Sequence, residues 1–389
     1  MRALLLNPAV LLTTTESGYL AYDTVTDRLH ELNPLAALLV ELCDGQRNSD
    51  ELLDLAAPHL PKDSTHALMQ WLEEAINEGL LVVAEDGRPP STTKELSANQ
   101  LDELSDRLRD VGKVQAAYLC QARAAELQPQ DRPRLRRLAE LAHIAGKRTE
   151  AKEAYERCLA LEPADAEVRH LLTSLRDEVA PQRVPSECIE QLYQRFSKFY
   201  ETNMCEELDY HGPTYLAEAI ADALQGRSSL EALDLGCGTG LSGQAIAPWT
   251  SRLVGVDLSK EMLKFAETAG IYHELHAAEI TTWLQDTTDR FDLIIACDSL
   301  IYFGDLAQVL APAAQRLRAG GIFGFSVEQA RVPPFRLTDS GRYEHHEDHV
   351  REIAETTGFD IISMNEHFIR MEYGQEVIGW FVVLRTPNH

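Results

Sequence analysis

Long apolar runs, cysteine pairs and basic charge are all scarce in this sequence. No segment of its 389 residues approaches the roughly 20 apolar residues that a membrane-spanning helix needs. The seven cysteines are odd in number and form no C-x-x-C pair, which excludes the usual zinc and disulfide patterns. Lysine and arginine total 36 against 62 acidic residues, and a net charge of −26 disfavours nucleic acid as a partner. We therefore expect a cytoplasmic protein with reduced cysteines, no metal and no membrane partner.

The length fits two or three domains, and the composition is that of a soluble globular protein. Changes of pattern along the chain predict a multidomain architecture. Residues 1–88 read as a winged-helix-like α+β domain, residues 98–180 as a central set of α-helical repeats, and residues 186–389 as a C-terminal α/β domain. The polar, proline-paired stretch 85–99 reads as a linker.

The first domain alternates early and then becomes helical. Three short strands are predicted in "AVLLTTTE", "GYLAYDT" and "RLHEL". A helix follows, with Asn33 as N-cap, Pro34 at its first position and Gly45 at its end. Two further helices are predicted behind the capping residues Ser49 and Asp63, and "LVVAE" reads as a closing strand.

The second domain repeats itself with a period of 34 residues. Equivalent residues 34 apart include Gly112 and Gly146, and Leu127 and Leu161. This period is the signature of tetratricopeptide helix–turn–helix units, although an ordinary pair of helical hairpins would also fit. The first unit has Gln121 where the pattern expects an aromatic residue. Two repeats are too few to stand alone, so they must pack on a neighbour.

In the third domain, apolar strands alternate with helices, as in a doubly wound Rossmann-like α/β sheet. The strands are predicted in "EALDLG", "RLVGVDL", "FDLIIACD" and "GIFGFSVE". The first strand leads into "GCGTG", and glycines there permit a tight turn and close approach of a ligand. Asp234 precedes this loop, and an acid at that position suits a cationic ligand better than a pyrophosphate. Asp257, at the end of the second strand, is placed to accept hydrogen bonds from ribose hydroxyls.

This region resembles the class I S-adenosylmethionine-dependent methyltransferases, most closely those that also carry tetratricopeptide repeats. The resemblance covers residues 188–386 and is carried by "LDYHGP", "LDLGCGTGLSG", "LVGVDLSKEML", "CDSLIYFGDL", "GIFGFSVE", "SGRYEHH" and "GF". It implies S-adenosylmethionine as the cofactor. It also implies which residues contact the methionine moiety, the ribose and the adenine, and which residue forms the floor of the site. These residues are Asp234, Gly236, Cys237, Gly238, Gly240, Asp257, Leu258, Met262, Glu279, Ile280 and Asp298.

The helix before this domain carries three aromatic residues, Tyr193, Phe196 and Tyr200, at helical spacing. In the family that it resembles, an aromatic helix covers the cofactor, so Tyr193 and Tyr200 are expected to contact it. The alternative is a packing helix.

The methyl acceptor is predicted to be a carboxylate, because the fourth-strand motif "CDSLIYF" offers no side chain suited to deprotonating an amide. Arg342, Tyr343 and His345, with Tyr302 opposite, are predicted to clamp that carboxylate. A pairing of Arg342 with a local acid such as Glu328 is the alternative. The run "HHEDH" reads as an exposed histidine-rich loop rather than a ligand set.

Residues 9–84 resemble the small peptide-binding domain of the pyrroloquinoline quinone D type, which serves as the leader-recognition element (RRE) of enzymes that modify ribosomal peptides (RiPPs). The pattern runs from "LHELNPLAALLVELCDGQRNSDELLDL" to "WLEEAINEGLLVV". The resemblance implies a precursor peptide as partner, held through its leader at a sheet edge. Partner maturation enzymes or a homodimer are further expectations. A small-molecule O-methyltransferase with N-terminal interaction domains is the alternative, and a non-catalytic cofactor-binding scaffold is a third.

Overall fold

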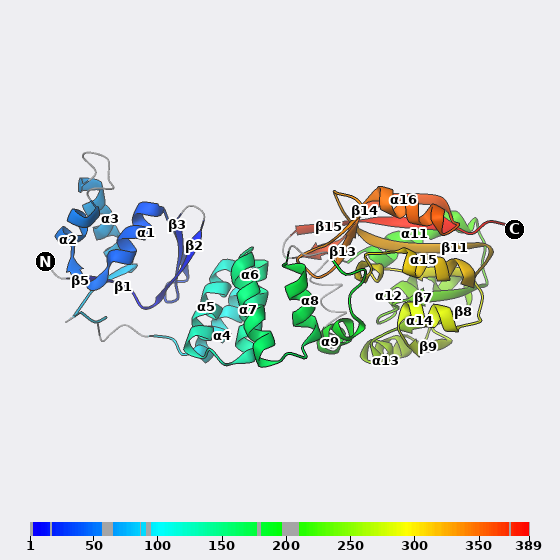
Figure 1. Ribbon diagram of the computed structural model, residues 1–389, viewed down its shortest axis with the longest axis horizontal. Coiled ribbons are helices and arrows are strands. Elements are labelled where there is room, and N and C mark those ends of the chain that lie inside the picture. Colours follow the sequence, from blue (N-terminus) through cyan, green and yellow to red (C-terminus); the bar gives the residue numbers. More distant parts are fainter. Residues whose placement is uncertain are drawn as a thin grey trace. The chain divides into compact units, whose positions relative to one another are not determined.

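The computed structural model describes residues 3–15, 18–56, 65–85, 87–90, 95–176, 180–196, 210–372 and 375–388. The chain forms two compact units, Met1–Leu161 and Glu162–His389, which are described separately below (Figure 1). The two units divide after Leu161, whereas the sequence predicted domain boundaries near residues 88–98 and 180–186. Helix α8 (Ala166–Ser174), which lies within the predicted range of the repeats, belongs to the second unit.

Two small antiparallel sheets and three helices form the first part of unit 1. The strands β5, β1 and β6 make one sheet, and β2, β3 and β4 make the other. The elements are β1 (Ala3–Leu6), β2 (Val10–Thr15), β3 (Gly18–Asp23), β4 (Arg28–Leu32), α1 (Pro34–Leu42), β5 (Asp44–Asn48), α2 (Ser49–Ala56), α3 (Thr65–Asn77) and β6 (Leu81–Val83). The three early strands and the closing strand are confirmed, whereas β1 and β5 were not predicted.

Capping explains where these helices begin. The Asn33 side chain accepts hydrogen bonds from the backbone N–H groups of Leu35 and Ala36, as predicted for α1. Gly45 does not end α1, because the helix stops at Leu42 and Gly45 lies in β5. The cap of α2 is Asn48 rather than the predicted Ser49, since Asn48 accepts from the N–H groups of Asp50 and Glu51. Asp63 lies outside the described residues.

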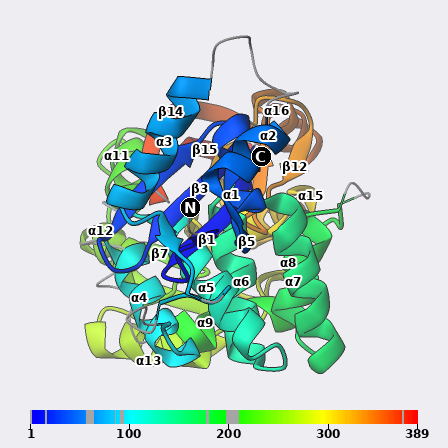
Figure 2. The ribbon, with the colours of Figure 1, turned by 90° about the vertical axis from the view of Figure 1, so that its left-hand side faces the viewer.

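Four helices complete unit 1, and their bounds recur after 34 residues. Helices α4 (Ala98–Asp110) and α5 (Val114–Leu127) are followed by α6 (Arg132–Ile144) and α7 (Arg148–Leu161). Each pair turns at a glycine with positive φ, Gly112 at 78° and Gly146 at 75°, a conformation that favours glycine. Figure 2 views the unit with these helices below the strands of the first part. The observed repetition agrees with the period read from the sequence.

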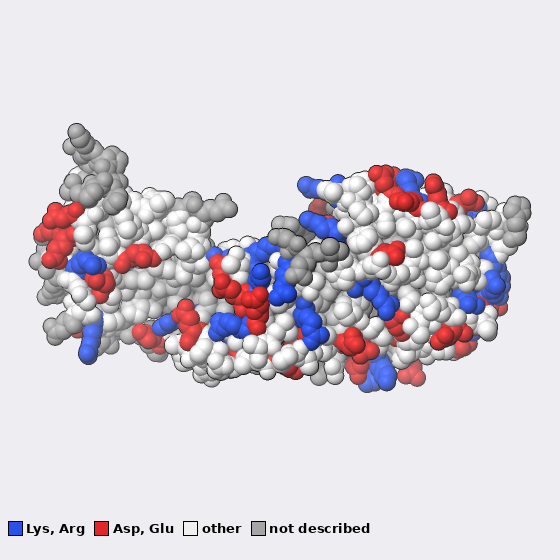
Figure 3. Space-filling view, in the orientation of Figure 1, with Lys and Arg blue, Asp and Glu red and all other residues white. Residues whose placement is uncertain are grey.

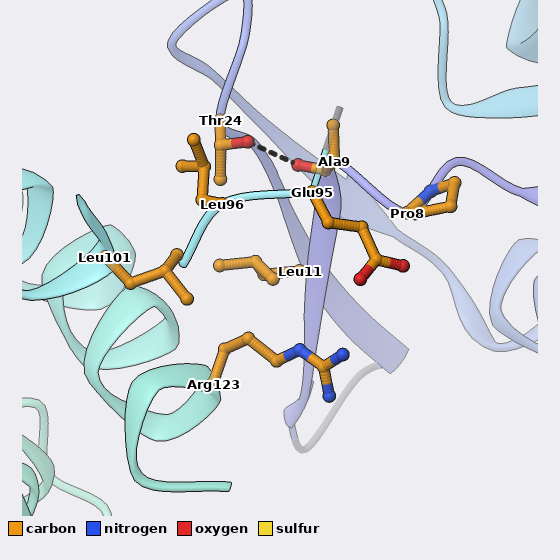
Figure 4. Close-up of a pocket in the computed structure, with 8 residues that line it drawn as sticks. All are labelled: Pro8, Ala9, Leu11, Thr24, Glu95, Leu96, Leu101 and Arg123. Carbon is orange, nitrogen blue, oxygen red and sulfur yellow. Dashed lines mark hydrogen bonds between the residues drawn. The ribbon is translucent and has the colours of Figure 1, made fainter. Parts of the chain in front are cut away.

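The sheet of β2, β3 and β4 packs on these helices within unit 1. Lys113 Nζ lies 2.6 Å from Asp27 Oδ2, and Lys147 Nζ donates a 2.9 Å hydrogen bond to the Thr14 carbonyl. Figure 4 shows Leu11 of β2 and Leu101 of α4 facing each other across a cavity of about 20 Å³. That volume holds about one water, so the two parts pack tightly here.

The second unit is built on a nine-stranded mixed sheet. Parallel strands run in the order β9, β8, β7, β10, β11, and β15 then joins β11 antiparallel, with β14 beside it. The strands are β7 (Leu230–Leu235), β8 (Thr250–Asp257), β9 (Glu274–Ala277), β10 (Phe291–Ala296), β11 (Leu317–Gln329), β12 (Phe335–Leu337), β13 (Tyr343–His345), β14 (Asp360–Glu372) and β15 (Gln375–Arg385). The predicted Rossmann-like α/β sheet is confirmed. The chain order reverses between β7 and β10, which places a ligand crevice at their carboxyl ends.

Helices cover both faces of this sheet (Figure 1). The described helices of this unit are α8 (Ala166–Ser174), α9 (Ser186–Phe196), α11 (Gly212–Leu224), α12 (Leu241–Ile246), α13 (Lys260–Ala269), α14 (Ile280–Asp286), α15 (Ala307–Arg316) and α16 (Glu347–Thr356), with the short helices η4 (Ala247–Trp249) and η5 (Leu300–Tyr302). Alternate strand residues are buried on opposite faces: Leu233 packs with α14, α15 and α16, whereas Ala232 packs with α11 and α12. This double burial explains the nearly continuous apolar strands.

None of the helices in the described ranges combines the length and the apolar composition that spanning a membrane requires. On the face drawn in Figure 3, acidic and basic side chains are interspersed over the C-terminal unit. An example is the 2.6 Å pair of Arg351 and Glu347 on α16.

Candidate active site

The glycine loop between β7 and α12 adopts a backbone that only glycine takes readily. Gly236, Gly238 and Gly240 have φ values of 71°, 55° and 101°. Space is a second constraint, because a β-carbon on Gly236 would lie 2.5 Å from the Ser299 β-carbon. Cys237, inside the loop, is buried. The loop therefore presents bare backbone to the crevice at the strand ends.

Asp234 is fully buried at the end of β7, directly before the loop. Tyr272 Oη donates a 2.7 Å hydrogen bond to its Oδ2 atom. Its other oxygen, Oδ1, has no hydrogen-bond partner among the described residues. Burial raises the pKa of Asp234 to about 7, against the lowering effect of the Tyr272 hydrogen bond. One oxygen of this carboxylate is fixed by the protein and the other is available to a ligand.

Asp257 lies at the end of β8, beside the loop. Its Oδ2 accepts a 2.9 Å hydrogen bond from Gly238 N–H, and its Oδ1 accepts a 2.7 Å bond from Ser259 N–H. Burial raises its pKa, and these N–H donors lower it. A carboxylate has about four acceptor sites, so two remain for ligand hydroxyls. Beyond it, Met262 is buried on α13 within 3.8 Å of the β-carbon position of Gly238, and Leu258 is half-buried.

Glu279, the next predicted acid, serves as the N-cap of α14. Its carboxylate accepts hydrogen bonds from the N–H groups of Thr281 and Thr282, and Arg183 Nη1 lies 3.2 Å away. These hydrogen bonds hold its pKa below the usual range against the effect of burial. Ile280 follows, half-buried. The structure thus commits much of the Glu279 carboxylate to the helix cap, and its contact with adenine stays a prediction.

Asp298 forms part of a buried ion network across the sheet. It follows β10 with φ at 52°, an uncommon conformation for a non-glycine residue. Arg370 Nη1, from β14, donates to both Asp298 carboxylate oxygens at 2.9 and 3.1 Å, and Arg370 Nη2 donates to Glu328. Arg370 is only 2% exposed. Arg342 Nη1 lies 3.9 Å from the same Glu328 carboxylate, which is the pairing weighed as the alternative.

Two tyrosine hydroxyls lie beside this network. Tyr302 of η5 and Tyr193 of α9 share a 2.8 Å hydrogen bond, with their rings edge to face. Burial raises the pKa of Tyr302, and the nearby cations of Arg342 and Arg370 counteract this. The structure therefore brings Tyr302, Arg342 and Tyr193 together at the carboxyl ends of β10 and β11. Tyr200 lies outside the described residues.

The strand order and the glycine loop agree with a comparison against known families, in which the family described as "Methyltransferase domain" matches residues 233–323. The C-terminal unit contains a class I S-adenosylmethionine-dependent methyltransferase domain. Its cofactor is S-adenosylmethionine.

Two curated relatives each align with about a third of this chain or less. A ubiquinone biosynthesis O-methyltransferase from Proteus mirabilis (strain HI4320) is 28% identical over 132 residues, which is 32% of this chain and 51% of that protein. One from Bordetella avium (strain 197N) is 27% identical over 113 residues, covering 28% and 46%. This chain thus spans about half the length of each relative. A solved S-adenosylmethionine-dependent methyltransferase from Clostridium acetobutylicum ATCC 824 aligns with 50% of this chain and 99% of its own, at 19% identity and a TM-score of 0.38.

The methyltransferase residues in the structure fit this cofactor. The ligand carries a sulfonium and an ammonium group, and the open Oδ1 of Asp234 is a buried anionic acceptor with no other described partner. The ribose has two hydroxyls, and Asp257 retains acceptor capacity for them. The loop of Gly236, Gly238 and Gly240 leaves the backbone uncovered beside both acids.

Two residues predicted for the acceptor clamp are not brought to this methyltransferase site. Tyr343 is fully buried, and its hydroxyl donates to the Pro181 carbonyl while its ring packs on Phe335. His345 is also fully buried, and its ring stacks on His349 with a centroid distance of 5.7 Å. Burial and His349 lower the pKa of His345 to about 3, so it cannot serve as a cation for a carboxylate.

The run "HHEDH" is therefore not an exposed loop. His345 and His349 point into the protein, and His346 caps α16 by accepting from Asp348 N–H. Within the described part of the chain, no group of three histidine, cysteine or acidic residues has an arrangement suited to a metal ion. The six cysteines of that part are buried.

Sequence reasoning missed Tyr272 and Arg370. Arg370 could have been noticed, because it is a charged residue within the strand segment "HFIRME". Tyr272 has no such signal on its own. The glycines at 243 and 255 that accommodate its ring lie within the quoted motifs, but their role depends on the tertiary structure.

Proposed function

We propose that this protein O-methylates a peptide that its N-terminal residues 1–88 recognise, using S-adenosylmethionine bound in the C-terminal unit. The acceptor is a carboxylate of that peptide, and the product is a methyl ester. In this proposal residues 1–88 act as a leader-recognition element of the pyrroloquinoline quinone D type, with a winged-helix-like fold. The tetratricopeptide-like repeats of 98–180 space that element from the catalytic domain.

The observation that carries the proposal is the position of Arg342 and Tyr302 beside the buried network of Asp298, Glu328 and Arg370 at the carboxyl ends of β10 and β11. Arg342 is 24% exposed in its side chain, and a guanidinium binds carboxylates through paired hydrogen bonds. Glu328, its neighbouring acid, is also bound by Arg370, so the network of two acids and two arginines is electrically balanced. An incoming carboxylate could then approach Arg342 without meeting an uncompensated anion.

The chemistry needs positioning more than proton removal. When bound, S-adenosylmethionine supplies a methyl group on a cationic sulfur. A carboxylate oxygen, already ionised at neutral pH, forms the new bond to that methyl carbon as the carbon–sulfur bond breaks. The chain's residues hold both reactants: Asp234 and Asp257 on the cofactor side, and Arg342 with Tyr302 and Tyr193 on the acceptor side. Alignment of two reactants of this kind lowers barriers by about 7–11 kcal/mol at best.

Recognition of an extended peptide is supported by an unpaired strand edge in the described part of unit 1. Strand β2 packs on α5, and β4 pairs only with β3 in the described sheet. Leu29 on β4 and Leu38 on α1 are 50% and 36% exposed. A peptide that adds as a strand gains backbone hydrogen bonds there and apolar contacts for alternate side chains.

Mass spectrometry of candidate precursor peptides, incubated with the full-length enzyme and S-adenosylmethionine, tests the reaction. We expect the mass of one methylene to be added and then lost in mild alkali, as an ester requires. A product stable to alkali would move the acceptor to nitrogen or carbon.

Recognition by the first domain has its own test. Leu29→Asp should raise the KM for the precursor at least tenfold and leave the affinity for S-adenosylmethionine unchanged. The control is Val111→Asp, which alters another exposed apolar side chain, 69% exposed, in the repeats. Equal kinetics for the two variants would remove the recognition role of β4.

The second candidate is an O-methyltransferase acting on a small molecule, with the N-terminal part serving in protein interaction. It is favoured by the relatives from Proteus mirabilis and Bordetella avium, which are described as ubiquinone biosynthesis O-methyltransferases. Methylation of a small phenol or acid without any peptide would select this candidate.

A further inference from the structure

The Asp234 carboxylate combines one fixed oxygen with one open oxygen. Tyr272 holds Oδ2 at 2.7 Å, whereas Oδ1 is buried and makes no hydrogen bond to any described residue. A buried carboxylate oxygen without a partner is costly, and native structures rarely tolerate one without a ligand or water. The open oxygen therefore indicates a ligand group that donates hydrogen bonds.

Three glycines make room for the Tyr272 ring. A β-carbon on Gly243 would lie 2.2 Å from Tyr272 Oη, and one on Gly255 would lie 2.9 Å from its ring. On Gly240 the distance would be 3.1 Å. Gly243, in α12, and Gly255, in β8, do not have a positive φ, so the backbone does not require glycine there. Glycine weakens helices and strands, and its presence at Gly243 is explained by the tyrosine, whereas Gly255 makes room for Tyr272 together with Leu275.

We propose that Tyr272 is a positioning residue for the cofactor: it fixes the Asp234 carboxylate so that Oδ1 receives the ammonium group of S-adenosylmethionine. This inference rests on the proposed methyltransferase function. Tyr272 acts through Asp234, because its hydroxyl donates its hydrogen bond to that carboxylate. Without it, a buried carboxylate could turn away from the ligand or take up a proton.

The surroundings of Asp234 make protonation the measurable consequence. The titratable groups that face it are Asp257, Cys237 and Tyr272, and the Gly243 N–H also lowers its pKa. Burial raises the pKa values of the Cys237 thiol and the Tyr272 hydroxyl far above neutrality, so both stay neutral. Asp234, with a pKa of about 7, titrates near neutral pH, and burial also raises the pKa of Asp257 beside it. The ionised form of Asp234 is the one that attracts an ammonium group.

Calorimetric titration of the full-length protein with S-adenosylmethionine, from about pH 6 to about pH 9, tests the proposal. Removing the donor in Tyr272→Phe should raise the pKa of Asp234 by about one unit or more, since hydrogen bonds to charged groups are the strong ones. For a rise of one unit we expect affinity about fivefold below wild type near pH 7 and about tenfold below it near pH 6, with the difference shrinking towards about pH 9, where Asp234 is ionised in both proteins. A loss of equal size at every pH would mean mere structural damage and would overturn the proposal.

Two further variants separate positioning from damage. Gly243→Ala keeps the hydroxyl but displaces the ring, and it should reproduce the pH-dependent loss. In an Asp234→Asn background, Tyr272→Phe should change the affinity less than twofold, because the group through which it acts is gone. An undiminished effect in that background would refute the assignment.

The control is Tyr22→Phe, which removes another tyrosine-to-aspartate hydrogen bond, 3.0 Å from the buried Tyr22 to the exposed Asp27 in unit 1. It should leave the pH profile of cofactor binding unchanged. If the wild-type protein binds no S-adenosylmethionine at any pH, the proposed function itself fails, and this result is distinct from every outcome above.

Discussion

The cofactor side and the acceptor side of the C-terminal unit are held together in different ways. On the cofactor side, two of the three acids are fixed by backbone groups close to them in the sequence: Asp257 by Ser259 N–H two residues away, and Glu279 by Thr281 and Thr282 N–H. The third, Asp234, is held by the Tyr272 side chain 38 residues away. On the acceptor side, side chains bind partners far along the chain. Arg370 reaches Asp298 over 72 residues and Glu328 over 42, and Tyr193 reaches Tyr302 over 109.

The two sides therefore differ in what positions their side chains: mainly local backbone hydrogen bonds on one side and a buried ion network on the other. Local backbone capping positions an acid as soon as the strand ends, so function can be read from a short motif. A buried ion network is positioned only when the whole sheet has closed, and its parts depend on one another. Damage on the cofactor side should therefore affect ligand binding first, and damage on the acceptor side should affect stability first.

Breaking the ion network should have the largest effect. Arg370→Met leaves Asp298 and Glu328 buried without their cation, and we expect the free energy of unfolding to fall by about 3–5 kcal/mol. Urea denaturation measures this. Arg252→Met is the matched control, because Arg252 is 28% exposed, pairs with Glu274 and Asp289, and should cost about 1 kcal/mol or less.

The same Arg370 variant sharpens the comparison. We expect the folded fraction to bind S-adenosylmethionine within about threefold of wild type, a difference below the 1.4 kcal/mol of a tenfold change. A tenfold loss of affinity would indicate that Asp298 belongs to the cofactor site, as the sequence resemblance implies.

Acid should destabilise the C-terminal unit through the buried pair of His345 and His349. Burial lowers the pKa of His345 to about 3 and lowers that of His349, whereas the unfolded chain takes up these protons below about pH 6.5. The folded state therefore keeps its full stability above about pH 6.5 and loses it as pH falls towards 3, by about 1.4 kcal/mol per pH unit for His345, and His349 adds to this loss. Thermal unfolding across this range measures the slope.

His345→Phe removes one of these protonation sites and should flatten that slope between about pH 6 and pH 4. His66→Phe, at an exposed position on α3, is the control and should leave the slope unchanged. A slope that is the same in all three proteins would mean that the buried histidine pair does not govern acid stability.

Much of the fold and of the cofactor side was predictable, and the reason is local. The glycines at 236, 238 and 240 and the acids at 234 and 257 sit at strand ends that the apolar pattern reveals. The positions of Tyr343 and His345 were not predictable, because they depend on contacts with residues far along the chain. Tyr343 and His345 stand beside Arg342 in the sequence, but they lie in the short strand β13, which buries both of them. The stack of His345 on His349 and the reach of Tyr343 to Pro181, over 162 residues, exist only in the folded chain.

A smaller effect, on binding alone, is expected from Asp257→Ala. Each charge-assisted hydrogen bond to a ribose hydroxyl contributes about 1.5–3 kcal/mol when buried, so the affinity for S-adenosylmethionine should fall at least tenfold. Calorimetry measures the affinity, and an unchanged melting temperature would show that the fold is intact. Glu274→Ala, which alters an exposed acid of neighbouring β9, should bind the cofactor normally. Normal binding by Asp257→Ala would remove this residue from the cofactor site.

The smallest effect should come from Tyr343→Phe, and it decides between the two tyrosines that the sequence assigned to one clamp. The hydroxyl of Tyr343 is spent on the Pro181 carbonyl, so its loss should cost about 1 kcal/mol of stability and leave kcat/KM for the methylated acceptor unchanged. Tyr302→Phe removes the hydroxyl that meets Tyr193 beside Arg342, and it should lower kcat/KM about tenfold with a similar loss of stability. The paired measurement is a melting curve and a methyl-transfer rate for each variant. Equal losses of rate would place Tyr343 back in the site, and equal rates near wild type would remove Tyr302 from it.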